Sequence, residues 1–111
     1  LNASAEPIIL ADTEGRILAA NAAMARIMGT GLDVVIGKTI FDFMPPELQA
    51  VRAAQLASFL RSGEVFRYEG TRDGRVLDTT VYPVFDEGGR LVQIAVYAYD
   101  ITARKQAEEA L

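Results

Sequence analysis

An arginine, a glutamine and a tyrosine form the combination in this chain best suited to binding a carboxylate. Arg52 and Gln55 lie three residues apart in a segment with helical patterning, on the arc that carries most of its apolar residues. An arginine that faces a protein core requires a partner, and its planar guanidinium binds carboxylates through paired hydrogen bonds. One hypothesis is that Arg52, with Gln55 or Tyr68, anchors the carboxylate of a small apolar ligand. The alternative is that Arg52 lies at the edge of the arc and extends its charged end into solvent.

Cysteine and histidine are absent from all 111 residues, which removes many kinds of site. Disulfides, thiolate nucleophiles, zinc–thiolate sites and flavin–cysteine adducts are excluded, as are the commonest metal ligand and the commonest general base near neutral pH. A net charge of −4 argues against a nucleic-acid surface. No apolar run approaches the roughly 18 residues of a membrane span. We expect a single globular domain with no metal site, no nucleic-acid partner and no membrane span in this segment.

The elements that position these side chains begin with a predicted hairpin. Residues 7–11 (PIILA) and 16–20 (RILAA) are short apolar runs, and residues 12–15 (DTEG) between them have the composition of a turn. Asn21 stands where an N-cap belongs, ahead of good helix formers, and Gly29 ends that helix.

A longer helix is predicted to follow a stretch of short turns. Residues 32–44 indicate short helical or 3₁₀ turns that are broken by Gly37. The next helix should span residues 47–61 and close at Gly63. Its predicted inward arc contains Leu48, Val51, Leu56, Phe59 and Leu60 together with the arginine and glutamine described above.

The last third of the chain is predicted to form three strands, residues 64–71, 75–85 and 90–99, joined by glycine-containing turns. Alternation puts one apolar set on a single face, toward the helices: Leu77, Thr79, Val81, Ile94, Val96 and Ala98. The opposite face carries Asp78, Thr80, Gln93 and Ala95, and a predicted interface of Val76, Tyr82, Tyr97 and Tyr99. An ordinary half-covered sheet is the alternative for this second face.

The chain ends with a charged, alanine-rich segment, DITARKQAEEAL. The carboxylate of Asp100 and the hydroxyl of Thr102 are suited to cap a starting helix, and Asp100 and Arg104 are spaced for an ion pair. Ala103, Ala107, Ala110 and Leu111 begin a narrow seam of the kind found in two-helix coiled coils. A solvated tail that frays is the alternative.

The predicted order of elements and several motifs resemble the PAS domain family. The residues that carry the resemblance are ADTEGRILAAN (11–21), IGKTIFDFMPPE (36–47), the DGR and EGG turns and, above all, the terminal segment that begins Asp-Ile-Thr. The resemblance covers essentially the whole chain. It implies an α+β fold with a five-stranded antiparallel sheet in the order 2-1-5-4-3, helices packed on one face, and a cavity between sheet and helices.

The resemblance also implies a division of the chain and a role in signalling. Residues 1–6 would end an N-terminal flanking helix or linker, residues 7–101 would form the PAS domain, and residues 102–111 would start a signalling helix. Asp100, Ile101, Thr102 and Arg104 would form the junction to that helix. The chain would be a cytoplasmic, homodimeric piece of a larger bacterial protein, a sensor histidine kinase of a two-component system or a cyclic-dinucleotide enzyme, with its effector domain C-terminal.

The cavity implied by the resemblance has a predicted lining and an open question about its contents. The candidate lining residues are Ile9, Ala11, Met28, Phe43, Arg52, Gln55, Phe59, Phe66, Tyr68, Leu77, Thr79, Val81, Ile94, Val96 and Ala98. Haem would need iron ligation by Met24, Met28 or Met44, which at helical positions are usually core residues. A non-covalent flavin usually needs inner polar side chains, and the inner strand faces offer only Thr79. We expect no cofactor, and a small apolar or carboxylate ligand instead.

Three functions remain open on the sequence. The first is a sensory module that passes ligand binding, or an upstream signal, to the helix after Asp100. The second is a ligand-free dimerisation module, which a solidly packed interior would favour. The third is a small enzyme on a cup-shaped α+β fold, with Asp78 and Tyr68 transferring protons, although Asp78 is predicted to face outward. We expect no enzymatic activity.

Overall fold

The structure, a computed structural model that describes residues 6–111, is built around one antiparallel sheet. Its strands are β1 (Ile8–Asp12), β2 (Ile17–Ala20), β3 (Phe66–Arg72), β4 (Arg75–Phe85) and β5 (Leu91–Asp100), in the spatial order β2-β1-β5-β4-β3. The helices are α1 (Ala22–Met28), α2 (Leu32–Val35), the 3₁₀ helix η1 (Ile40–Phe43), α3 (Pro46–Ser62) and α4 (Thr102–Glu109). The predicted strand order and fold class are confirmed. The predicted flanking helix of residues 1–6 falls, except for residue 6, outside the described residues.

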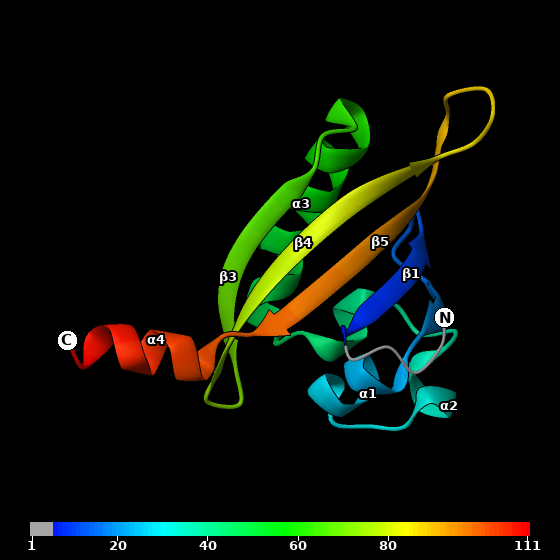
Figure 1. The fold of residues 1–111 in the computed structure, drawn as a ribbon. Helices are drawn as coiled ribbons and strands as arrows, with labels where there is room; N and C mark the ends of the chain where they lie inside the picture. Colours follow the sequence, from blue (N-terminus) through cyan, green and yellow to red (C-terminus); the bar gives the residue numbers. More distant parts are fainter. Residues whose placement is uncertain (1–5) are drawn as a thin grey trace.

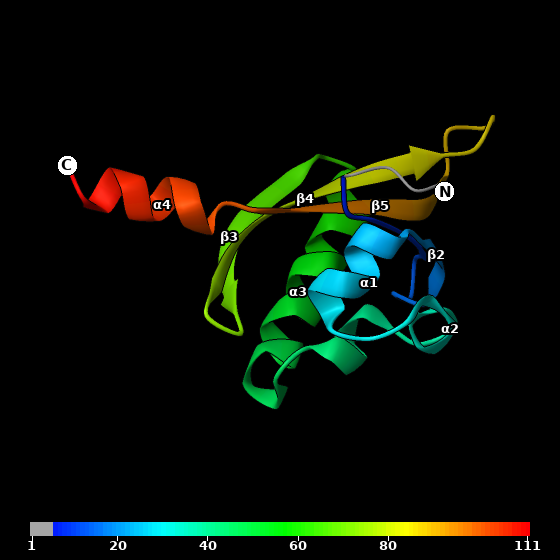
Figure 2. The ribbon, with the colours of Figure 1, turned by 60° about the horizontal axis from the view of Figure 1, so that its bottom comes forward.

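The helices are distributed unequally around the sheet. Figure 2 shows α1, α2 and α3 on one face of the sheet, whereas α4 extends beyond its end. Figure 1 shows α4 continuing from β5 and pointing away from the domain. No helix of residues 6–111 combines the length and hydropathy that a membrane crossing requires.

Two aspartates shape the hairpin turns at the ends of the strands. Asp12 Oδ1 accepts hydrogen bonds at 2.9 Å from the amides of Glu14 and Arg16. Asp86 Oδ1 accepts the equivalent pair from Gly88 and Arg90, also at 2.9 Å. Because the side chain replaces missing backbone partners, each turn closes within four residues.

Asn21 joins the first hairpin to the first helix. Its Oδ1 accepts from the amide of Met24 at 3.0 Å, as predicted for an N-cap, and also from the amide of Ile8 at 3.2 Å. Its Nδ2 donates to the carbonyl of Glu6 at 2.6 Å. The side chain is 2% exposed, so one buried amide side chain fixes the start of α1 against the start of β1.

Helix α3 agrees with the predicted helix to within one residue at each end, and Gly63, with φ 66°, ends it. The predicted inward arc needs one correction, because Val51 is 50% exposed. Arg52, Gln55 and Phe59 lie within about 60° of one another on a 100° helical wheel, and Val51 falls outside that sector. Phe59 is the buried residue of this helix.

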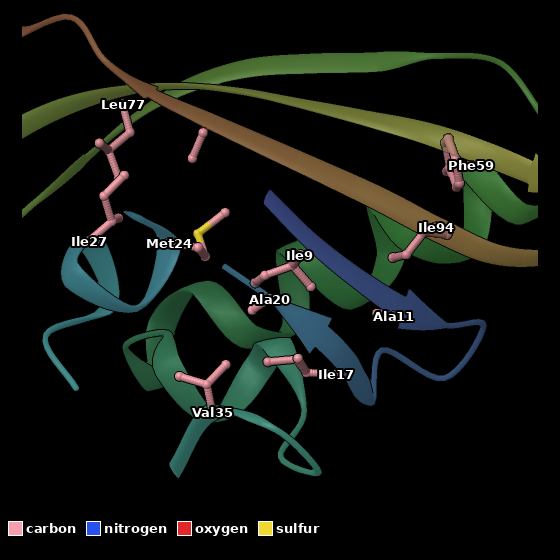
Figure 3. Packing of buried hydrophobic residues seen from close by; sticks show 11 residues of the cluster. Ile9, Ala11, Ile17, Ala20, Met24, Ile27, Val35, Phe59, Leu77 and Ile94 are labelled. Carbon is pink, nitrogen blue, oxygen red and sulfur yellow. The ribbon is translucent and has the colours of Figure 1, made fainter. Parts of the chain in front are cut away.

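The core lies between the inner face of the sheet and helices α1 to α3. Its buried cluster consists of Ile9, Ala11, Ile17, Ala20, Met24, Ile27, Val35, Phe59, Leu77, Ile94 and Ala98. Figure 3 shows Met24 and Ile27 of α1 pointing toward the sheet. Leu77 of β4 and Ile94 and Ala98 of β5 belong to this cluster, so the predicted alternation along these two strands is confirmed for the inner face.

Candidate functional site

An apolar cavity of about 140 Å³ lies between the inner face of the sheet and helices α1, η1 and α3. Its lining consists of Ile9, Met24, Ile27, Met28, Ile40, Phe41, Phe43, Met44, Arg52, Gln55, Leu56, Phe59, Phe66, Tyr68, Arg72, Leu77, Thr79, Val81, Ile94, Val96 and Ala98. Every residue predicted for the pocket is in this set except Ala11.

Ala11 belongs to the packed core instead. It is fully buried, pairs with Ile94 across the sheet and lies where the register with β2 shifts. The cavity reaches β1 at Ile9, which lies two residues before Ala11 on the same face of the strand. The alternation of side chains along the strand correctly identified the face that Ala11 points to, but it does not indicate how far along a strand a cavity extends.

The predicted trio around Arg52 is assembled. Arg52 Nη1 donates to Gln55 Oε1 at 2.7 Å, and the guanidinium carbon lies 3.8 Å from the centroid of the Tyr68 ring. Arg52 is half-buried and borders both the cavity and an open groove beside it. Within residues 6–111 the structure gives Arg52 no carboxylate partner. A cation held over an aromatic ring without an anion is available to bind an acid.

Arg72 is the charged cavity residue that the sequence analysis missed. Its Nη1 donates to the carbonyl of Phe43 at 2.6 Å and its Nη2 to that of Met28 at 3.4 Å, so it links β3 to η1 and α1. The predicted strand ended at residue 71, which left Arg72 in a turn. When β3 is extended by one residue, alternation puts Arg72 on the same face of the strand as Phe66 and Tyr68. This alternation is the sequence signal that could have identified Arg72 as a cavity residue.

The outer face of the sheet carries the predicted tyrosines. The rings of Tyr82 and Tyr97 pack edge to face, with centroids 5.7 Å apart, and Tyr99 lines the same shallow surface pocket. The pKa of Tyr99 is raised mainly by partial burial of its ring and, to a smaller extent, by the neighbouring carboxylate of Glu6. Val76 shares the parity of Tyr82 but lies six residues away, about 20 Å along the strand, so it does not join this group.

Asp78 faces outward, as predicted, and is held by Arg67. Arg67 Nε and Nη2 donate to its two carboxylate oxygens at 2.8 and 2.6 Å, and this bond lowers the pKa of Asp78. Tyr68 faces the cavity on the opposite side of the sheet. The acid and the phenol considered for proton transfer are therefore separated by the sheet.

The junction between β5 and α4 is a small hydrogen-bonded unit. Asp100 Oδ1 accepts from the amide of Thr102 at 3.0 Å and from its hydroxyl at 2.6 Å. The hydroxyl of Thr102 also accepts from the amide of Val76 at 2.9 Å. Ile101, between Asp100 and Thr102 in the chain, is buried. The predicted pair of Asp100 with Arg104 is wrong: Asp100 precedes the helix, and Arg104 pairs with Glu108 at 3.7 Å.

The titration of Asp100 gives a first prediction. Hydrogen bonds from the Thr102 hydroxyl and amide lower the pKa of Asp100, so its folded-state value lies below the unfolded value of about 3.9. The stabilisation that it contributes is complete above the unfolded value and is lost as the pH falls through the folded one. We expect the NMR shift of the Thr102 amide to titrate below the usual aspartate range, and Asp100→Asn to remove this titration. A midpoint at or above 4 would contradict the junction geometry.

Comparison with known proteins identifies the fold. The family model described as PAS fold matches residues 1–106. The chain belongs to the PAS family. The PAS domain of BvgS from Bordetella pertussis is 28% identical, with a TM-score of 0.75 over 97% of this chain and 90% of that one. A domain of an HTR-like protein from Haloarcula marismortui is 27% identical, with a TM-score of 0.71 over 89% of this chain and 100% of that one.

A third solved structure shares the PAS fold at lower identity. A sensory box sensor histidine kinase from Vibrio cholerae is 14% identical, with a TM-score of 0.73 over 87% of this chain and 82% of that one. A comparison with curated proteins finds no significant match. PAS domains are sensory modules, so the cavity and the junction of this PAS domain are the features through which its function is best considered.

Proposed function

We propose that this PAS domain senses a small molecule and transmits its binding to an output helix in a larger signalling protein. The observation that carries the proposal is the pair of strands shared by the cavity and the junction. Leu77 and Ala98 line the cavity, and the residues that hold α4 lie on the same strands, Val76 near the start of β4 and Asp100 at the end of β5. A change of packing in the cavity therefore acts on the same two strands that hold the helix.

The bound molecule is proposed to be small and apolar, with a carboxylate anchored by Arg52. Ligand pockets for drug-sized molecules usually measure about 300–1,000 Å³, whereas this cavity measures about 140 Å³. Its size and its apolar lining favour a small molecule over haem or flavin. Gln55 and Tyr68 support the guanidinium from two sides, which holds it in position for a carboxylate.

Signalling is proposed to involve a homodimer. The tyrosine surface of Tyr82, Tyr97 and Tyr99 lies on the sheet face without helices, and Tyr82 and Tyr99 are 43% and 39% exposed. Exposed aromatic groups of this kind mark interfaces. In a dimer, the exposed alanines of α4 would continue as a two-helix coiled coil toward a C-terminal effector domain. The parent is proposed to be a cytoplasmic sensor histidine kinase or cyclic-dinucleotide enzyme.

Native mass spectrometry of gently purified protein tests this proposal. We expect a dimer that carries a reproducible small-molecule adduct, lost in Arg52→Ala but retained in Val51→Ala, which changes an exposed residue of the same helix. A dimer without an adduct would replace the sensory function by ligand-free dimerisation. A bare monomer would contradict both parts of the proposal.

A further inference from the structure

We propose that Arg72 is a second acid-binding residue of the cavity, and that the ligand is an aromatic or branched-chain monocarboxylate whose acid group lies between Arg52 and Arg72. The inference rests on the proposed sensory function and specifies the ligand class. It arises from four observations: a guanidinium Nε without a hydrogen-bond partner, a gap between two arginines, their lack of acidic partners, and the size of the adjoining cavity.

The guanidinium of Arg72 has one edge that the protein leaves almost unused. Its Nη1 is well occupied by the carbonyl of Phe43, but the 3.4 Å contact from Nη2 to Met28 is long for a hydrogen bond. Its Nε is buried and has no hydrogen-bond partner in the described chain. A buried donor of a charged group is costly to leave unpaired, so an acceptor brought by a ligand would be favourable.

The same chain shows what this edge of an arginine binds. Arg67 uses Nε and Nη2 side by side to hold both oxygens of Asp78, at 2.8 and 2.6 Å. The Nε and Nη2 of Arg72 form the equivalent edge. A carboxylate therefore matches its geometry through two parallel hydrogen bonds.

Both arginines line the groove beside the cavity. Alternation along β3 puts Tyr68, Gly70 and Arg72 on the inner face, and Arg52 covers the ring of Tyr68. A Cβ at Gly70 would lie 3.7 Å from Arg52 Nη2. Because Gly70 has no side chain, the inner face of β3 stays open between the two guanidinium groups.

The acids that border this groove are not paired with either arginine. Asp42 accepts from the amide of Thr39 at 2.9 Å, and Asp73 lies in the β3–β4 turn. Within residues 6–111, neither Arg52 nor Arg72 forms an ion pair. An acidic ligand would provide the anion that this pair of cations lacks.

The cavity limits the apolar part of the ligand. An engineered apolar cavity of about 150 Å³ in another protein binds benzene, and the cavity here measures about 140 Å³. It therefore has room for one phenyl ring or a short branched alkyl group. An acid of this size places its ring or branch in the cavity and its carboxylate in the groove.

Calorimetry with phenylacetate, 4-methylpentanoate and the neutral analogue phenylacetamide tests the proposal. We expect the acids to bind at least about tenfold more tightly than the amide, and Arg72→Lys to weaken acid binding by about tenfold or more. Arg75→Lys is the matched control, because Arg75 donates to the carbonyl of Ile27 at 2.9 Å from the same hairpin but does not line the cavity. It should change acid binding less than about twofold.

Gly70→Val separates ligand binding from folding. A β-branched residue suits a strand interior, so the variant should remain folded, while its side chain occupies the space between the arginines and abolishes acid binding. Equal affinity for acid and amide, equal effects of the two lysine variants, or no binding of either acid would overturn the inference. A neutral adduct in native mass spectrometry would then leave the sensory function standing, whereas a protein without any adduct would remove both.

Discussion

Phe59→Ala is expected to destabilise the domain by about 3–5 kcal/mol, the usual cost of truncating a buried phenylalanine. Phe59 is 4% exposed and is the buried residue of α3. Its neighbours on the inward arc, Arg52, Gln55 and Leu56, are half-buried. One ring therefore provides much of the apolar attachment of a 17-residue helix. Urea unfolding, followed by circular dichroism, measures the loss.

Val51→Ala is the matched control, because Val51 lies on the same helix and is 50% exposed. Its effect should remain within about 0.5 kcal/mol. The space left by Phe59→Ala adjoins the existing cavity, so benzene should raise the stability of this variant more than that of the wild type. Equal costs for the two substitutions would contradict the packing of α3 against the sheet.

Short-range signals in the sequence were sufficient to predict most of the helices and strands. Period-two alternation identified the inner faces of β4 and β5, because one side of this sheet is covered and the other is not. Asn21 and the glycines that end α1 and α3 identified helix boundaries, since their conformations and hydrogen bonds are determined locally. The strand order depended on the family resemblance, because no local signal determines which strands pair.

The errors in the site prediction share a physical cause. Whether Ala11 borders a cavity, and whether Val76 reaches the tyrosines, depends on distance along a strand, which alternation does not measure. Arg104 has carboxylates at suitable spacing on either side, and the start of α4 at Thr102 decides between them. Arg72 was missed because a strand boundary that moves by one residue turns a loop arginine into a cavity residue.

Thr102→Val is expected to release α4 while leaving the rest of the domain folded. Valine has nearly the shape of threonine, but it lacks the hydroxyl that accepts from Val76 and donates to Asp100. Helix α4 has eight residues, none of them buried, and isolated helices shorter than about 12–15 residues are marginal in water. Its other attachments in the described chain are the buried residue Ile101, whose amide donates to the carbonyl of Val76 at 2.9 Å, and the partly exposed 3.1 Å ion pair of Lys105 with Glu69. The helical signal of α4 should therefore fall sharply.

The matched control is Thr71→Val, on the exposed outer face of β3. It should leave the helical signal of α4 unchanged, because α4 is attached through Thr102 rather than through this threonine. Backbone NMR shifts of α4 in the two variants give the comparison residue by residue. If Thr102→Val kept α4 fully helical, the junction would not be the attachment point that the hydrogen bonds indicate.

Filling the cavity is proposed to change how α4 is held, and amide hydrogen exchange with and without phenylacetate is the sharpest test of this coupling. We expect the acid to slow exchange in the strands that line the cavity and also to change exchange at the amides of α4. In Thr102→Val the change in the strands should remain, while the change in α4 should disappear. Protection of the cavity strands in the wild type, with no change anywhere in α4, would contradict a connection between cavity and output helix.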